Sequence, residues 1–150
     1  TFQVNITGAI NISKNYFLSH KKMKLKKCKI INIGSIYGNM SPDFRIYGKN
    51  DNFNSEIYGI TKAGIIQLTK YLSVLMSKHN INVNCMSPGG ILNETKKQNS
   101  RFVKKYINRI PLNRMAIPND FFTCILFLAS DSSSYVTGQN IIIDGGLSAW

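Results

Sequence analysis

Three short apolar runs, rich in β-branched residues, constrain the fold of this chain more than any other feature. They are KIINIG at 29–34, INVNCMS at 81–87 and NIIID at 140–144. Runs of this length and composition are typical of strands that are buried on both faces of a parallel sheet. At their ends stand GSIYG, SPGGI and DGG, whose small residues would let a ligand approach the backbone closely.

Helical patterns fill the segments between these runs. Apolar residues recur at helical spacing over 2–20 and over 55–79, where Ile65, Leu68, Leu72 and Leu75 form a stripe. A short helix is expected near 101–108, and Pro118 opens another. The alternation of strands and helices predicts an α/β fold, with a parallel sheet covered on both faces.

The composition fits one globular domain, residues 1–150. Hydrophobic residues make up 43% of the chain and charged residues 17%, which is enough for a core of its own. No apolar run has the length of a membrane span, so we expect no membrane partner. Three scattered cysteines, Cys28, Cys85 and Cys124, lack metal-ligand spacing. They are interpreted as buried thiols in a reducing cytoplasm, and we expect no metal site.

The net charge of +12 raises the alternative of a nucleic-acid-binding domain, whose affinity would fall steeply with salt. The one dense basic cluster is HKKMKLKK at 20–27. It lies at the end of a predicted helix, where cations suit the helix dipole. It has no interleaved aromatic residues on which bases could stack. We therefore interpret it as a solvated face and expect no nucleic-acid partner.

A tyrosine and a lysine are four residues apart, Tyr58 and Lys62, so they share one face of the predicted helix. Ser35 ends the first strand, and a strand end and the next helix start meet at the ligand edge of such a sheet. A nearby ammonium favours the phenolate form of tyrosine. Such a tyrosine can move a proton to or from an alcohol or carbonyl oxygen. The set predicts an alcohol–ketone oxidoreductase, with a cofactor carrying the hydride.

Five segments together resemble the short-chain dehydrogenase/reductase family. They are VNITG at 4–8, IINIGS at 30–35, IYGITKAG at 57–64, INVNCMSPGGI at 81–91 and FLASDSSSYVTGQNIIIDGG at 127–146. They stand in the family's order and cover nearly the whole chain. The resemblance implies a Rossmann-like, three-layer α/β/α parallel sheet and NAD or NADP as the cofactor.

The resemblance also assigns roles to individual residues. Tyr58 would donate and accept the proton, and Lys62 would lower its pKa and bind the nicotinamide ribose. Ser35 would position the substrate oxygen, and Asn5 would hold a water that links Lys62 to solvent. The expected catalytic residues are Asn5, Ser35, Tyr58 and Lys62. The expected cofactor-binding residues are Tyr58, Lys62, Pro88, Gly89, Ile91 and Thr95.

One part of the family pattern is missing. No G-x-x-x-G-x-G phosphate loop occurs, and the family's N-terminal strands are absent with it. We expect that the chain is the C-terminal part of a longer enzyme, and that this fragment alone is inactive and poorly stable, with one side of KIINI unpaired. The alternative is a truncated, non-catalytic subunit that only assembles with a partner.

The segment between Ser35 and Tyr58 is longer than is usual in the family and is polar, with Asp43, Arg45, Tyr47, Lys49 and Asn52. It favours a small, sugar-like substrate over a steroid or fatty-acyl one. The segment also resembles that of members associated with bacterial surface-sugar biosynthesis. The family resemblance further implies a homodimer or homotetramer that assembles through the helices at 2–20 and 55–79 and through the last strand.

Overall fold

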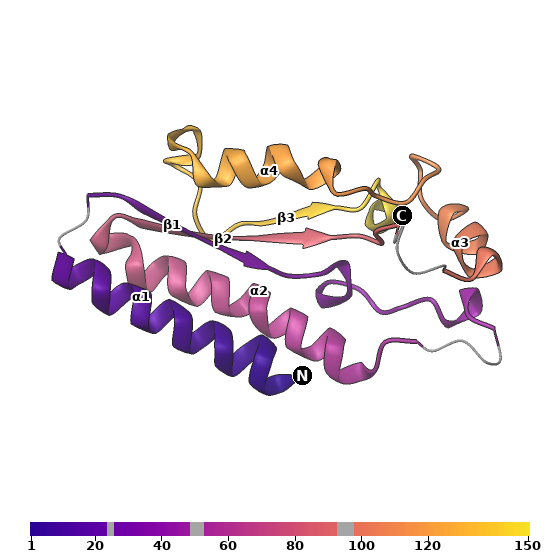
Figure 1. Ribbon diagram of the computed structural model, residues 1–150, viewed down its shortest axis with the longest axis horizontal. Helices are drawn as coiled ribbons and strands as arrows, with labels where there is room; N and C mark the ends of the chain where they lie inside the picture. Colours follow the sequence, from indigo (N-terminus) through magenta and orange to yellow (C-terminus); the bar gives the residue numbers. More distant parts are fainter. Residues whose placement is uncertain (24–25, 49–52, 93–97) are drawn as a thin grey trace.

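A parallel sheet of three strands forms the centre of the molecule in the computed structural model, which describes residues 1–23, 26–48, 53–92 and 98–150. The strands are β1 (Cys28–Ile33), β2 (Ile81–Pro88) and β3 (Asn140–Ile143), in that order. Cys28 is opposite Ile81, and Cys85 is opposite Asn140. All three strands point the same way, so their carboxyl ends meet at one edge (Figure 1). The predicted parallel sheet is confirmed.

Helices cover both faces of the sheet, which gives the predicted three layers (Figure 1). Two long helices, α1 (Ala9–Met23) and α2 (Glu56–Met76), lie on one face, and α4 (Asn119–Ala129) lies on the other. A short helix, α3 (Ser100–Ile107), stands beyond the carboxyl ends of the strands. The 3-10 turns Ile36–Gly38 and Phe44–Ile46 lie at the same end of the molecule.

The core between α2 and the sheet contains a polar stripe as well as an apolar one. Leu72 and Met76 pack against strand residues Ile81 and Val83. Thr69 is buried among them, and its hydroxyl donates to the Ile65 carbonyl at 2.9 Å, which satisfies it within the helix. Leu75, the last residue of the apolar stripe that the sequence shows, is not among the buried residues of this core. Its side chain is 47% exposed, because the helix turns the Leu72–Met76 face to the sheet instead.

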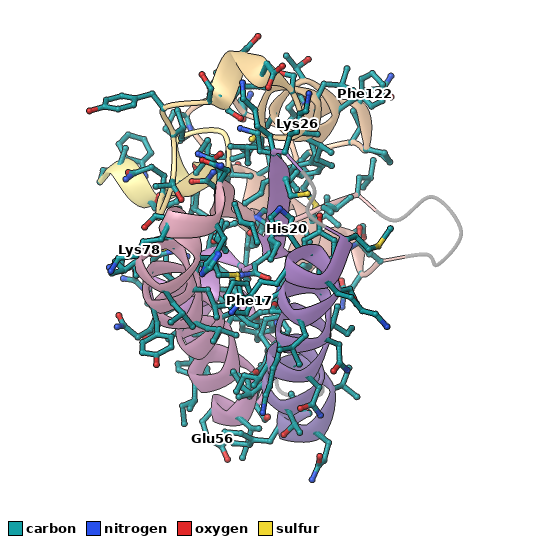
Figure 2. All side chains as sticks on the ribbon, turned by 90° about the vertical axis from the view of Figure 1, so that its left-hand side faces the viewer. Phe17, His20, Lys26, Glu56, Lys78 and Phe122 are labelled. Carbon is teal, nitrogen blue, oxygen red and sulfur yellow. The ribbon has the colours of Figure 1, made fainter. Side chains whose placement is uncertain are left out.

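The first helix begins irregularly, with a π-helical turn over Gln3–Gly8 ahead of α1. Such turns widen the helix locally and often occur at functional sites. Further along, Phe17 fills the space between α1 and α2 (Figure 2), where its ring meets the edge of His79 at 4.9 Å between centroids. The helix pair is therefore joined at its far end, and the irregular turn lies at the end near the strand tips.

One edge of β1 has no strand partner among the described residues, because β1 pairs only with β2. Of the three cysteines, only Cys85 is buried, and Cys28 and Cys124 are partly exposed, so the prediction of three buried thiols is wrong. These two are less buried because they lie at the start of the edge strand and on α4. In the part of the chain that the structure describes, no helix is both long and apolar enough to cross a membrane.

Candidate active site

Gly34, the residue after β1, allows the chain to leave the sheet at Ser35. A Cβ atom on Gly34 would collide with Ser87 Oγ and would lie 2.8 Å from Cys85 Sγ, so only glycine lets the chain run this close to β2. The Gly34 amide still donates to the Met86 carbonyl at 2.8 Å. Ser35 then caps the Ile36–Gly38 turn, its Oγ accepting from the Tyr37 amide at 3.2 Å. Its side chain is therefore buried and held in one orientation.

Tyr58 and Lys62 lie in the first turns of α2 and contact each other, as their spacing predicts. The Lys62 ammonium lies over the Tyr58 ring, 5.7 Å from its centroid, within the range of cation–π attraction. Lys62 also donates to the carbonyl of Ile33, the last residue of β1, at 2.8 Å. Burial lowers the pKa of Lys62, and the nearby Cys85 opposes this shift. The pair therefore joins the helix start to the end of the strand.

Ser35 and Tyr58 line one cavity of about 190 Å³ at the carboxyl ends of the strands. The end of β2 and the segment that follows it supply another part of the wall, with Pro88, Gly89 and Ile91. Three separate parts of the chain thus meet around a space that can hold a small molecule. Of the sequence-predicted site residues, this cavity brings together Ser35, Tyr58, Pro88, Gly89 and Ile91.

Two glycines let the segment after β2 pass close to its neighbours in this wall. A Cβ on Gly89 would lie 2.8 Å from the Cα of Asp144, and one on Gly90 would lie 2.5 Å from the Tyr106 ring. Larger residues at these positions would displace Asp144, just after β3, or Tyr106. Burial raises the pKa of Tyr106 to about 12, so this ring is a neutral part of the cavity wall.

Lys62 and Asn5 line a different cavity, of about 350 Å³, on the other side of the first turns of α2. Asn5 lies in the π-helical turn and donates through Nδ2 to the Thr61 hydroxyl at 2.9 Å. Thr61 is fully buried and donates in turn to the Tyr58 carbonyl at 2.9 Å. The sequence reasoning missed Thr61, although a helical Thr that bonds back three residues is a known pattern.

A row of polar side chains supports Ser35 from the sheet side, and the sequence reasoning missed it too. Ser87 donates to Asn140 Oδ1 at 2.6 Å, and Asn140 donates to Asn39 Oδ1 at 3.2 Å. Asn39 then donates to the Ser35 carbonyl at 3.4 Å. These residues come from β2, β3 and the turn after Ser35, so nothing local in the sequence indicates their contact.

Asp43 and Arg45, two charged residues of the long segment, do not line the cavity of about 190 Å³, whereas Tyr47 of the same segment does. Asp43 pairs with Arg45 at 2.8 Å and with Arg109 at 3.4 Å. The hydrogen bond from Arg45 lowers the pKa of Asp43 to about 2. The charge of Asp43 is therefore paired with those of the two arginines. Aromatic residues and Asn54 line the cavity instead. The rings are those of Tyr37, Tyr47, Phe102 and Tyr106.

Three of the predicted residues, Lys49, Asn52 and Thr95, lie outside the described residues. Across the described ranges, no three His, Cys, Asp or Glu side chains gather closely enough to hold a metal ion. What the geometry offers is a serine and a tyrosine that line one small space, with an ammonium over the tyrosine ring. Such a set can hold an oxygen and move a proton to or from it.

Comparison with known proteins agrees with this chemistry. The family model described as enoyl-(acyl carrier protein) reductase matches residues 1–148. An NADH-dependent L-xylulose reductase from Ambrosiozyma monospora is 32% identical over 153 residues, which cover 99% of this chain and 53% of the reductase. A 3-oxoacyl-acyl-carrier-protein reductase from Thermotoga maritima is 38% identical over 145 residues, covering 96% of this chain and 54% of that protein.

A solved structure shows the same fold. A short-chain dehydrogenase from Leptospira borgpetersenii, with bound NAD+, matches 98% of this chain with a TM-score of 0.89 and 44% identity, over 54% of its own length. The chain belongs to the short-chain dehydrogenase/reductase family, and its Rossmann-like fold is confirmed. It spans about half the length of the relatives it matches.

Proposed function

We propose that the protein is an NAD(P)-dependent oxidoreductase that interconverts an alcohol and a ketone. The observation that carries this proposal is the single cavity lined by both Ser35 and Tyr58, with Lys62 placed behind the Tyr58 ring. The named activities of the relatives, a xylulose reductase and an acyl-carrier-protein reductase, belong to the same reaction class.

In the direction of oxidation, Tyr58 acts as the general base. Its phenolate takes the proton of the substrate hydroxyl while the hydride leaves the same carbon, and the carbonyl forms. Ser35, whose Oγ is fixed by the turn it caps, holds the substrate oxygen. Lys62, charged and close to the ring, favours the phenolate. Asn5 and Lys62 share a cavity, which gives room for the proposed water between Lys62 and solvent.

NAD or NADP would supply the chemistry of hydride transfer. The residues present fit such a cofactor, because Gly89 and Gly90 leave no room for larger side chains and present backbone to the cavity. Pro88, Gly89 and Ile91 would line the nicotinamide site, and Tyr58 and Lys62 would bind its ribose. Thr95 belongs to the same proposal, although it lies outside the described residues.

For the substrate we propose a small, sugar-like molecule. The cavity of about 190 Å³ is small, and Tyr37, Tyr47 and Asn54 bring polar groups to its wall. Among the relatives, an L-xylulose reductase is named for a sugar. The proposal also draws on the segment between Ser35 and Tyr58, which resembles that of enzymes of bacterial surface-sugar biosynthesis.

A second candidate is an acyl-type substrate, favoured by a larger cavity next to the first. It measures about 570 Å³ and shares Tyr37, Asn54 and Tyr58 with the smaller one. Phe44 and Phe53 lie on its border, more than half exposed. An apolar tail could rest there while its carbonyl reaches Tyr58.

The proposal includes assembly and location. Residues of α1 and α2 leave apolar side chains exposed, among them Leu18, Tyr71 and Val74, which supports a homodimer or homotetramer formed through these helices. We place the protein in the cytoplasm, where its three free cysteines would stay reduced. The alternative of a non-catalytic subunit predicts assembly without turnover.

The test uses the natural full-length protein. We would follow NADH and NADPH absorbance with pentitols, ketopentoses and a 3-oxoacyl thioester, and compare the wild type with Ser35→Ala. Turnover of a pentitol or ketopentose that Ser35→Ala reduces strongly is the expected result. Turnover of the thioester alone would select the second candidate, and no turnover of any substrate would favour the non-catalytic subunit.

A further inference from the structure

Two tyrosines on the cavity wall form a second polar feature beside the catalytic residues. We propose that Tyr37 and Tyr47 make a hydroxyl-recognition subsite, which selects substrates that carry another hydroxyl beyond the carbon that reacts. The inference rests on the proposed function and deepens it, because it names the group that the substrate must bear. It assigns Tyr47 and Tyr37 as specificity-determining residues.

The geometry of the pair leaves it incompletely satisfied. The two phenol oxygens are 3.5 Å apart, which is long for an O–H···O bond, whose usual length is about 2.7–2.8 Å. Both rings line the cavity that contains Ser35 and Tyr58. A substrate hydroxyl that contacts both oxygens would complete the hydrogen bonding that the tyrosines give each other only weakly.

The protonated phenol of Tyr37 favours a neutral polar group as the ligand of this pair. Burial, and then the hydrogen bond from Tyr47, raises the pKa of Tyr37, so its phenol stays protonated. A phenol has one donor and can also accept. If one tyrosine donates to the other, one proton remains to be given to the ligand, and the oxygens can still accept. A hydroxyl, which both donates and accepts, matches this pattern.

Tyr47 is held firmly in place, which a specificity role requires. The preceding residue, Ile46, is buried in a core cluster with Ile36 and Tyr106. The Tyr47 ring packs against the Phe102 ring of α3, with 5.3 Å between centroids. The backbone next to it is tied to the same region, because Lys105 Nζ donates to the Arg45 carbonyl at 2.8 Å.

Further contacts tie the subsite to the part of the chain that carries Ser35. Tyr37 follows Ser35 by two residues and donates its amide to the Ser35 hydroxyl. Tyr47 reaches the cavity through a segment that the Asp43–Arg109 ion pair joins to the chain beyond α3. Both tyrosines are therefore held next to Ser35 in one cavity, where a polyol offers the further hydroxyl that they would bind and a simple alcohol offers none.

The experiment compares two substrates in the full-length protein, a pentitol and 2-pentanol, which lacks the additional hydroxyls. We expect Tyr47→Phe and Tyr37→Phe each to lower kcat/KM for the pentitol by about 3- to 10-fold, which is the range for one neutral hydrogen bond. The loss should lie mainly in KM, and kcat/KM for 2-pentanol should stay unchanged. Tyr135→Phe is the matched control, because Tyr135 is fully exposed.

The outcomes separate the subsite from the reaction itself. An equal loss on both substrates, or no loss on the pentitol, would overturn the subsite while leaving the oxidoreductase proposal standing. Turnover of the 3-oxoacyl thioester alone would overturn the subsite and leave the oxidoreductase proposal standing. A wild-type protein that turns over no pentitol, no ketopentose and no thioester would overturn the proposed function, and the subsite would fall with it. Circular dichroism of each variant confirms that a loss does not come from unfolding.

Discussion

The cavities on the two sides of the first turns of α2 are built differently. The one with Tyr58 and Ser35 is lined by three distant parts of the chain and by aromatic rings. The one with Lys62 and Asn5 lies between the π-helical turn and the unpaired edge of β1, and it is bordered by exposed apolar residues such as Val4 and Ile12. The substrate side is thus built from segments that lie far apart in the chain and carries aromatic rings, whereas the lysine side is built from the first helix, β1 and α2 and has exposed apolar side chains at its border.

We therefore expect Tyr58 and Lys62, one helical turn apart, to act on the reaction in different ways. Lys62 does not line the substrate cavity. It contacts the Tyr58 ring and the end of β1. Its effect on the reaction must therefore pass through Tyr58 or a bound cofactor, and substitutions on the two sides should have different signatures.

The largest effect is expected on the substrate side, from Tyr58→Phe. The substitution removes the hydroxyl that moves the proton and keeps the ring on which Lys62 rests. We expect kcat/KM to fall by about 10²- to 10⁴-fold, the usual contribution of a general acid–base group. The thermal midpoint should change little. Steady-state kinetics with the turned-over substrate measures the fall, and a loss of less than 10-fold would remove Tyr58 from its proposed role.

A smaller effect, with a different signature, is expected from Lys62→Met. Loss of the ammonium should lower kcat/KM by about 10²-fold, because a neighbouring charge shifts a pKa by about one to three units. Stability should not fall, since burial disfavours the charged form of Lys62 in the folded chain. A midpoint several degrees below that of the wild type would contradict this reading of the lysine side.

The pH dependence of the free energy of unfolding tests the direction of the pKa shift of Lys62. Its pKa in the folded chain lies below the ordinary value of 10.5, so between the two values the unfolded chain binds more protons. The free energy of unfolding should therefore rise with pH in that interval, relative to Lys62→Met. Taking the difference between the two proteins removes the opposite contribution of the buried tyrosines. Denaturant titration of both proteins at several alkaline pH values measures this difference in the free energy of unfolding.

The smallest effect is expected from Asn5→Ala. The variant loses the hydrogen bond to Thr61, which contacts the Tyr58 carbonyl and not its hydroxyl. We expect kcat to fall by about 3- to 10-fold, as for one neutral hydrogen bond, and KM to stay near its wild-type value. Asn11→Ala, on α1 itself, serves as the control. A fall as large as that of Lys62→Met would mean that Asn5 touches the reaction directly.

Much of the fold could be predicted because strands and helices leave periodic patterns in a local sequence. The sequence predicts strands at 29–34 and 81–87, which the structure places at Cys28–Ile33 and Ile81–Pro88, and it predicts the helix that carries Tyr58 and Lys62. The convergence of Ser35 and Tyr58 followed from the geometry of parallel sheets. The contacts of Thr61, Asn39 and Asn140 could not be predicted, because they depend on how distant segments pack.

The long segment after Ser35 shows the same limit. The sequence predicts a polar pocket from residues that include Asp43 and Tyr47. Asp43 pairs with Arg109 far along the chain, whereas Tyr47 lines the cavity. Polarity can be read from a sequence, but the direction in which a loop side chain points depends on its partners.

The most direct test of the account is a double-mutant cycle of Ser35→Ala and Tyr58→Phe in the full-length protein, measured as kcat/KM on one substrate. If both hydroxyls act on the same substrate oxygen in one cavity, the double variant should be scarcely slower than Tyr58→Phe alone, because residues that act as a unit are not additive. Losses that multiply independently would show that the two residues serve separate steps, and would contradict the shared site.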